Sequence, residues 1–410
     1  MDNMICPWID QHRDALLDLT ARLVATPSAN PPGDERAVVR VILDEMDRLG
    51  LTGAETVGHE PHRPNLIIRL GNQTAGPTLM LCGHTDTKPV GDSTDWKTDP
   101  LDAVVRDGKL YGLGSTDMKG AVAAMIYATA ALQKCKVQLG GQFIFVANAD
   151  EERTMKGSEF LVTEYGLEAD VALLGEPSGI AGDEFEYLHL LSRGITCFRV
   201  CVHGTQMHSS LSDRMPCVNA SVKLAQVLTQ MNDDLKLTFD PHPLCDGPTV
   251  NLGVKLEGGV GYGVYPGTAE FKCDIRTLPG MSEGQLRSDL ERFVEKMRER
   301  DSELDLEILF EDPPLNWMSP TEVSADHPLV GSLLSASKDI LGRRPILSAF
   351  PGGTDAAKFH GLGGIPTIPS FGPGWLPLAH GPNECVGVEA IVQAAKIYAL
   401  AAQRYLRPGS

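Results

Sequence analysis

The sequence predicts an α/β protein whose main domain is interrupted by a smaller α+β domain. Residues 1–189 alternate helix-period segments with short, almost continuous apolar runs, which is typical of a sheet covered by helices on both faces. Residues 190–312 follow the order βαββαβ, which is the ferredoxin-like split unit. Residues 313–410 return to the α/β pattern. We therefore expect one α/β domain built from the first and last segments, with residues 190–312 inserted into it.

The individual elements follow from apolar spacing and from turn residues. In the first segment we expect helices over 9–28 and 33–50, joined by the turn "NPPG", a helix over 117–135, and strands over 65–71, 78–84, 141–149 and 170–178. In the insertion we expect strands over 194–204, 249–259, 267–279 and 304–312, with helices over 219–234 and 282–301. In the last segment we expect helices over 326–341 and 388–406 and a strand over 345–350.

Length and charge narrow the classes of protein to consider. A chain of 410 residues exceeds what one hydrophobic core usually spans, and 42% hydrophobic with 22% charged residues excludes wholesale disorder. The net charge of −18 argues against nucleic acid or an anionic membrane surface as a partner. An anionic substrate would need a locally placed cation.

The expected location is the cytoplasm. No apolar run approaches the ~20 residues of a membrane span, and "MDNMICPWIDQHRD" lacks the basic-then-apolar order of a signal peptide. The nine cysteines form no C-x-x-C pair. Cys82, Cys197, Cys201 and Cys273 lie in strand-like runs, which favours buried free thiols in a reduced protein.

The first candidate for chemistry is the stretch "LMLCGHTDTKP". An apolar strand runs directly into His84 and Asp86, and in open α/β sheets ligands bind beyond the carboxyl ends of strands. Strand alternation places both side chains on the same side, so Asp86 could orient the imidazole of a metal-bound His84. The alternative is a structural histidine followed by a turn aspartate.

Further polar residues follow other predicted strands or begin helices. Asp117 falls at a helix start, where an N-cap worth about 1 kcal/mol is the alternative. Glu151 and Glu152 follow the apolar run "QFIFVANA", and a solvated turn would also explain them. Glu176 follows the next run and could be a loop residue, and His380 precedes the last helix and could be structural.

Taken together, these positions favour a metal site. Carboxylate and imidazole ligands without thiolate suit catalytic zinc, cobalt or manganese. Five candidate ligands exceed the needs of one catalytic ion. They fit two ions that lie about 3.5–4 Å from each other and share one bridging carboxylate.

The motifs resemble a known family along nearly the whole chain. In order, they are "GHTDT", "DWKTDPLDAVVRDGKLYGLGSTDMKG", "ADEE", "GEPS", "HSS" and "GGTDA…FGPG…AHGPNE". Together they resemble the acetylornithine deacetylase, succinyl-diaminopimelate desuccinylase and aminoacylase family of dinuclear-zinc metallopeptidases. The resemblance implies a zinc-peptidase-like catalytic domain, two zinc ions that cobalt can replace, and an inserted lid domain through which homodimers form.

The resemblance also implies a role for individual residues. Glu151 would be the general base, Asp86 would orient a metal ligand, His208 would help to polarise the substrate carbonyl from the partner subunit, and Arg276 would hold the substrate carboxylate. Tyr265 stands where relatives often carry asparagine, and this difference would affect substrate specificity rather than the metal site. One ion would be held by His84, Asp117 and Glu176, the other by Asp117, Glu152 and His380, and a loop with Gly353, Thr354 and Asp355 would face the substrate.

The predicted activity is metal-dependent removal of the acyl group from an N-acyl-L-amino acid. A water bridging two zinc ions would have its pKa lowered towards about 7 from 15.7. Glu151 would accept its proton and pass it to the leaving amine. Arg276 offers a forked cation suited to a carboxylate.

Three alternatives remain at this point. A metallo-carboxypeptidase or dipeptidase of the same family would use the same site, because a peptide is also an N-acyl amino acid. A non-catalytic binding protein on this scaffold predicts a lost ligand or base, whereas every expected position is filled. A nicotinamide-dependent oxidoreductase lacks support because no dinucleotide fingerprint follows the first strand.

Overall fold

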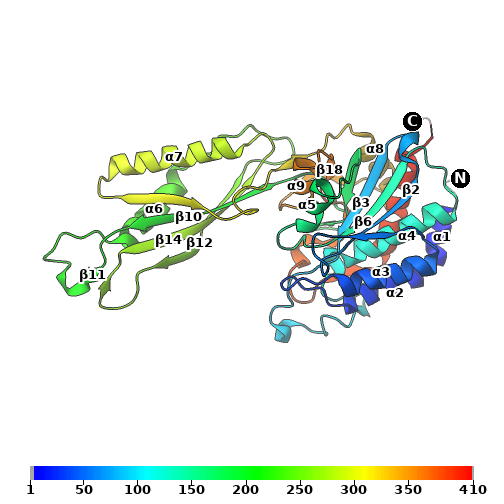
Figure 1. The fold of residues 1–410 in the computed structure, drawn as a ribbon, viewed down its shortest axis with the longest axis horizontal. Helices are drawn as coiled ribbons and strands as arrows, with labels where there is room; N and C mark the ends of the chain where they lie inside the picture. The colour runs from blue at the N-terminus through cyan, green and yellow to red at the C-terminus, as the bar shows by residue number, and fades with distance from the viewer. Residues whose placement is uncertain (1–3, 409–410) are drawn as a thin grey trace. The chain divides into compact units, whose positions relative to one another are not determined.

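A computed structural model describes residues 4–408. Residues 1–3 and 409–410 lie outside the described part. The segment that we compared with a signal peptide begins with residues 1–3. The chain divides into two compact units (Figure 1). The first contains residues up to 191, 322–350 and 354 onward, and the second contains 192–321 and 351–353.

The second unit extends past the predicted boundary at residue 312. The segment after residue 312 hydrogen-bonds to the first strand of that unit, with Cys197 N–H donating to Leu315 O at 2.7 Å and Ile195 N–H donating to Met318 O at 3.0 Å. These backbone bonds keep the returning chain in the second unit until Thr321. The sequence pattern misses this because the segment has no strand-like periodicity.

A six-stranded mixed sheet forms the centre of the first unit, with strand order β1-β2-β6-β3-β7-β18. The strands β6, β3, β7 and β18 are parallel to one another, and β2 and β1 continue the sheet antiparallel. Every residue of β3 is buried, as expected for a strand covered on both faces. The bounds are β1 Glu55–Val57, β2 Asn65–Gly71, β3 Thr78–His84, β6 Gln142–Asn148, β7 Val171–Leu174 and β18 Thr367–Ile368.

Helices cover both faces of this sheet (Figure 1). Helix α4 packs on β3 and β6 and against α10, whereas α5 and α9 contribute Leu161, Ala356 and Phe359 to a core with Met80 and Cys82 on the other face. The predicted α/β class is therefore confirmed. The helices are α1 Ile5–Gln11, α2 Arg13–Ala25, α3 Arg36–Leu49, α4 Gly120–Lys134, α5 Lys156–Thr163, α8 Pro328–Leu341, α9 Ala356–Gly361 and α10 Val388–Tyr405.

Two predicted elements of the first unit are each divided in two. The expected helix over 9–28 is broken at His12, whose ring nitrogen Nδ1 bonds to the backbone carbonyl of Trp8 at 2.8 Å and whose ψ is 13°. The expected strand over 170–178 ends at Leu174, and the chain turns through Gly175 and Glu176 before a new strand begins.

Shorter strands complete the first unit and the junctions. They form the sheets β20-β5-β4, β19-β8 and β16-β9-β17. Their bounds are β4 Val104–Arg106, β5 Lys109–Tyr111, β8 Pro177–Gly179, β9 Tyr187–Ser192, β16 Thr321–Glu322, β17 Ile346–Phe350, β19 Gly372–Trp375 and β20 Cys385–Gly387.

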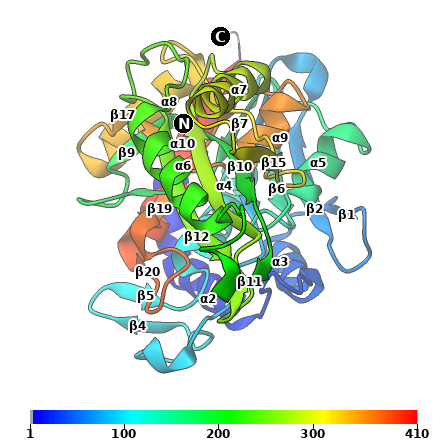
Figure 2. The same ribbon diagram turned by 90° about the vertical axis from the view of Figure 1, so that its left-hand side faces the viewer.

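The second unit has the expected βαββαβ order. Its antiparallel sheet runs β12-β14-β10-β15, and α6 and α7 lie on the same face of it (Figure 2). Alternate residues of β14 are buried, as the period of two predicts for a sheet covered on one face. The elements are β10 Gly194–His203, β11 Met207–His208, α6 Ala220–Asp234, β12 Thr249–Gly258, β13 Val264–Tyr265, β14 Thr268–Thr277, α7 Glu283–Arg300 and β15 Asp305–Phe310.

Candidate metal and catalytic site

The site lies beyond the carboxyl ends of three neighbouring parallel strands of the first unit. Strand β3 ends at His84, β6 is followed by Glu151 and Glu152, and β7 is followed by Glu176. Because β6, β3 and β7 are adjacent and parallel, their carboxyl ends meet at one edge of the sheet. Side chains that are separate in sequence therefore converge there.

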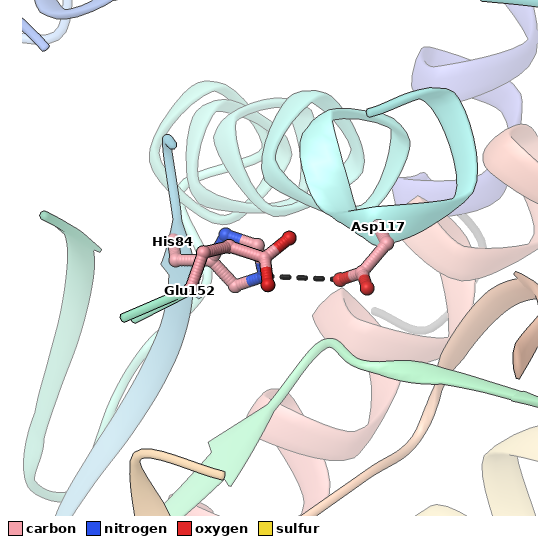
Figure 3. Close-up of side chains that lie close together, drawn as sticks. All are labelled: His84, Asp117 and Glu152. Atoms are coloured by element: carbon pink, nitrogen blue, oxygen red, sulfur yellow. Dashed lines mark hydrogen bonds and ion pairs between the residues drawn. The ribbon is translucent and has the colours of Figure 1, made fainter. Parts of the chain in front are cut away.

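Asp117 lies between two histidines. Its Oδ1 atom is 3.0 Å from His84 Nε2, and its Oδ2 atom is 3.1 Å from His380 Nε2. Figure 3 shows the carboxylate of Asp117 and the ring of His84 facing each other, with Glu152 beside them. Each oxygen of Asp117 thus faces a different imidazole, which is the arrangement of a carboxylate that bridges two ions.

Glu176 and Glu152 each lie beside one of these histidines. Glu176 Oε1 is 3.7 Å from His84 Nε2, and Glu152 Oε2 is 3.1 Å from His380 Nε2. One group of donors therefore surrounds His84 and another surrounds His380, with Asp117 common to both.

The donor set fits divalent metal ions. One donor atom from each of His84, Asp117 and Glu152 lies within 4.8 Å of the others, and the same holds for His84, Glu151 and Glu176. Carboxylate oxygens and imidazole nitrogens are the ligands of catalytic zinc and of related transition metals.

The charges of the site favour a bound cation. Burial, and then the charge of Asp117, raise the pKa of Glu176 well above 4.5. Burial opposes ionisation of Asp117, yet hydrogen bonds with His380 and His84 lower the pKa of its carboxyl below the usual range. Burial also opposes the charged form of His84, but the bond with Asp117 and the charge of Glu176 raise its pKa well above 6.5. Hydrogen bonds with Asp117 and then Glu152 raise the pKa of His380 to about 10. Protons on the histidines thus offset the carboxylates when no metal is bound.

Asp86 holds the two neighbouring glutamates by their backbones. Its Oδ1 and Oδ2 atoms accept the N–H groups of Glu151 and Glu152, both at 3.2 Å. We expected this carboxylate to orient His84, but His84 Nδ1 lies closer to the backbone carbonyl of Asp86, at 3.0 Å, than to its Oδ1 atom, at 3.6 Å. The carboxylate therefore binds the backbones of Glu151 and Glu152 and also accepts a hydrogen bond from Asn30 Nδ2 at 2.9 Å, while its role in orienting His84 stays a prediction.

Asp150 turns the chain immediately before the two adjacent glutamates. It adopts a left-handed backbone conformation with φ 66°, which turns the chain sharply after β6. Its side chain is fixed by Asn30 Nδ2 at 2.8 Å and by Arg63 Nη1 at 2.9 Å. After this turn, the side chain of Glu152 faces His380. Burial, and then the charge of Glu176, raise the pKa of Glu151 well above 4.5.

Asp117 does not cap a helix. Helix α4 begins only at Gly120, and Asp117 lies in an irregular turn with φ −131° and ψ 87°, outside the helical range. The N-cap alternative is therefore wrong. The turn is held by Glu384, which is 1% exposed and whose carboxylate accepts the N–H groups of Gly114, Thr116 and Asp117 at 3.0, 2.9 and 3.0 Å.

Sequence reasoning did not single out Glu384. The available signal was its place in "AHGPNE", four residues after His380, where a buried carboxylate would be costly unless several donors met it. Its partners are distant in sequence, so only the fold identifies them.

The other predicted site residues have different surroundings. In the second unit, His208 is exposed on β11 with Nδ1 2.8 Å from Ser210 Oγ, and Arg276 on β14 pairs with Asp274 Oδ2 at 2.9 Å. Gly353 belongs to the second unit. Thr354 and Asp355 are buried in the first unit, where Asp355 accepts hydrogen bonds from Asn148 and Ser158. The substrate-facing role of this loop stays a prediction.

An α/β sheet that gathers carboxylates and imidazoles at its carboxyl edge is typical of metal-dependent hydrolases. The chain belongs to Peptidase family M20/M25/M40, which matches residues 80–404. It is therefore a metallo-amidohydrolase that cleaves amide bonds.

Similar proteins include two curated enzymes and a solved structure. The chain is 30% identical over 386 residues to acetylornithine deacetylase of Proteus mirabilis, covering 92% of each chain. It is 30% identical over 353 residues to succinyl-diaminopimelate desuccinylase of Methylorubrum extorquens, covering 84% of this chain and 87% of the relative. The M20 family metallo-carboxypeptidase Sso-CP2 from Sulfolobus solfataricus has the same fold, with a TM-score of 0.75, 20% identity and coverage of 95% and 99%.

Proposed function

We propose that this enzyme removes the acyl group from an N-acyl-L-amino acid. The observation that carries the proposal is the Asp117 carboxylate, with one oxygen facing His84 and the other facing His380, together with the partly buried Glu151, which has a carboxylate oxygen within 4.8 Å of His84. The names of the two curated relatives, a deacetylase and a desuccinylase, support acyl-amino acids as the class of substrate.

The geometry favours two divalent ions, of which zinc is our proposal and cobalt a substitute. His84, Asp117 and Glu176 would hold one ion, and Asp117, Glu152 and His380 would hold the other. When bound, such ions acidify water and polarise a carbonyl oxygen.

Glu151 would move the proton. Its carboxylate would accept a proton from the attacking water and deliver it to the nitrogen of the leaving amine. The C–N bond of the amide breaks, and the products are a carboxylic acid and a free amino acid. Asp86, which binds the backbone N–H of Glu151, would keep this carboxylate in place.

The second unit would supply substrate contacts, as a lid. Arg276 offers a planar guanidinium for the carboxylate of the amino acid, and Asp274 orients it. His208, exposed on β11, would donate to the carbonyl oxygen as negative charge develops there.

We also propose a homodimer formed through the second unit. Strand β12 lies at the edge of its sheet and pairs with β14 alone in that sheet. Three of its apolar side chains are exposed, namely Val250, Val254 and Leu256 at 37%, 58% and 59%. A long apolar edge strand is a ready site for pairing with another chain.

A cytoplasmic location is part of the proposal. Among residues 4–408, no helix combines the length and the apolar character needed to cross a membrane. The location rests instead on buried cysteines that are free thiols, as expected in a reducing compartment, namely Cys82, Cys201, Cys273 and Cys385.

The second candidate function is that of a metallo-carboxypeptidase or dipeptidase. The fold of Sso-CP2, a metallo-carboxypeptidase, favours it, and a peptide presents the same amide and carboxylate as an N-acyl amino acid. The same metal positions and the same base would serve both reactions.

A hydrolysis screen tests the proposal. The metal-loaded enzyme is offered N-acetyl amino acids, N-succinyl amino acids and dipeptides, and the released amine is measured. The proposal expects the highest kcat/KM with an N-acyl amino acid. A preference for dipeptides supports the second candidate, and hydrolysis of none of them contradicts both.

A further inference from the structure

Lys88 lies directly beside one of the candidate metal ligands. It follows β3 by four residues, and its backbone N–H donates to Glu152 Oε1 at 3.2 Å. Its ammonium is 3.1 Å from Glu152 Oε2 and also donates to the backbone carbonyl of Glu152. The Lys88 side chain therefore wraps around Glu152, and both carboxylate oxygens of Glu152 contact Lys88.

The Lys88 ammonium contacts the same oxygen of Glu152 that faces His380. Glu152 Oε2 also lies 3.1 Å from His380 Nε2, so this oxygen faces the second group of donors. A lysine ammonium there competes for the oxygen and adds a positive charge next to the incoming ion. The Glu152 carboxylate is 3% exposed, so solvent screens this repulsion less than at the surface.

The other group of donors lacks such a cation. Among residues 4–408, the ion pairs that involve Glu176 and His84 connect them to each other and to Asp117 and Asp86, with no lysine or arginine. The buried Lys119 instead donates to the backbone carbonyl of Thr26 at 2.8 Å. The two halves of the site thus differ by one adjacent positive charge.

We propose that Lys88 weakens divalent-ion binding at the position of Glu152 and His380, so that the enzyme fills its two metal positions in order. The position of His84 and Glu176 fills first and holds its ion tightly. The position beside Lys88 fills second and exchanges its ion more readily. The inference rests on the proposed two-ion site. It adds that the two positions differ in their affinity for a divalent ion.

The test measures metal binding rather than activity. Metal-free enzyme is titrated with zinc by calorimetry, and cobalt binding is followed by its visible spectrum. Lys88→Met removes the charge and keeps much of the side-chain length, whereas Lys88→Arg retains the charge. Lys338→Met, which removes an exposed lysine of α8 in the same unit, is the matched control.

We expect the native enzyme to bind two equivalents of zinc with unequal affinities. Lys88→Met should tighten the second equivalent about tenfold and leave the first unchanged, because the repulsion of one nearby charge is removed. Lys88→Arg and Lys338→Met should match the native enzyme. An unchanged first affinity also shows that the Lys88→Met site is intact.

Two other outcomes would overturn the inference in distinguishable ways. If Lys88→Met binds two equivalents with the same two affinities as the native enzyme, the role of Lys88 is contradicted but the two-ion site is not. A single equivalent in every variant contradicts the two-ion site, and this inference with it.

Discussion

The Oε1 atom of Glu384 accepts a hydrogen bond from the backbone N–H of Asp117 at 3.0 Å. Glu384 follows His380 by four residues, so one short loop supplies a candidate metal ligand and also fixes the backbone of the candidate bridging residue. Burial, and then the charge of Asp117, raise the pKa of Glu384 to about 8, although three backbone N–H groups oppose the shift. This carboxylate therefore connects the loop of His380 to the turn that carries Asp117, although the two segments are far apart in sequence.

Glu384→Gln should weaken metal binding. The side-chain amide can present only one acceptor oxygen to the three N–H groups that Glu384 now accepts, so the turn that carries Asp117 loses part of its support. Changes to groups that position metal ligands typically cost about 10–100-fold in metal affinity or activity. Zinc titration of the metal-free protein measures the loss. Glu168→Gln, the same substitution at an exposed position, is the matched control, and equal affinities in the two variants would argue against the role.

Glu151→Gln should retain both ions and lose turnover. The amide cannot accept the proton from water, and general-base catalysis contributes about 10²–10⁴-fold. Steady-state kcat and elemental analysis of the same sample check both parts. Near-native kcat would remove Glu151 from the proton path.

Glu152→Gln should give a different result from its neighbour. Glu152 Oε2 faces His380, so its loss should release one metal equivalent. Elemental analysis after dialysis should show one ion in this variant and two in Glu151→Gln. Two retained ions would place Glu152 outside the ligand set.

Metal binding should release protons and strengthen as pH rises. In the metal-free protein, hydrogen bonds with Asp117 and Glu152 raise the pKa of His380 to about 10, so its imidazole holds a proton at pH 7, and the pKa of His84 is also raised above its ordinary value. A metal ion needs neutral rings and ionised carboxylates, so its binding displaces protons from the histidines and any proton held by Glu176, whose pKa is also raised. Affinity should therefore fall with decreasing pH throughout the range below 10. Calorimetry in buffers with different ionisation enthalpies counts the protons, and a value near zero would contradict the assignment of these histidines.

The parts of the fold that sequence predicts well are those governed by local pattern. Strand β3 matches the predicted range 78–84, because a run buried on both faces leaves a continuous apolar signature. The break at His12 depends on one side chain that bonds to the backbone of Trp8, which periodicity does not detect. The extension of the second unit to Thr321 depends on backbone pairing between distant segments.

The candidate site also contains residues whose positions could be predicted from the sequence and residues whose positions could not. His84, Glu151 and Glu176 follow apolar strands, so their positions at the sheet edge could be predicted. The placement of Asp117 in an irregular turn could not, because Glu384, more than 250 residues later, holds that turn. The contact of Lys88 with Glu152 likewise joins segments 64 residues apart.

The dependence of hydrolysis on bound metal tests the central claim most directly. The enzyme is stripped by a chelator, its metal content is checked, and hydrolysis of an N-acetyl amino acid is measured while zinc is returned stepwise. The arrangement around Asp117 predicts no hydrolysis without metal and full activity at two equivalents. Hydrolysis that continues undiminished after complete metal removal would contradict it.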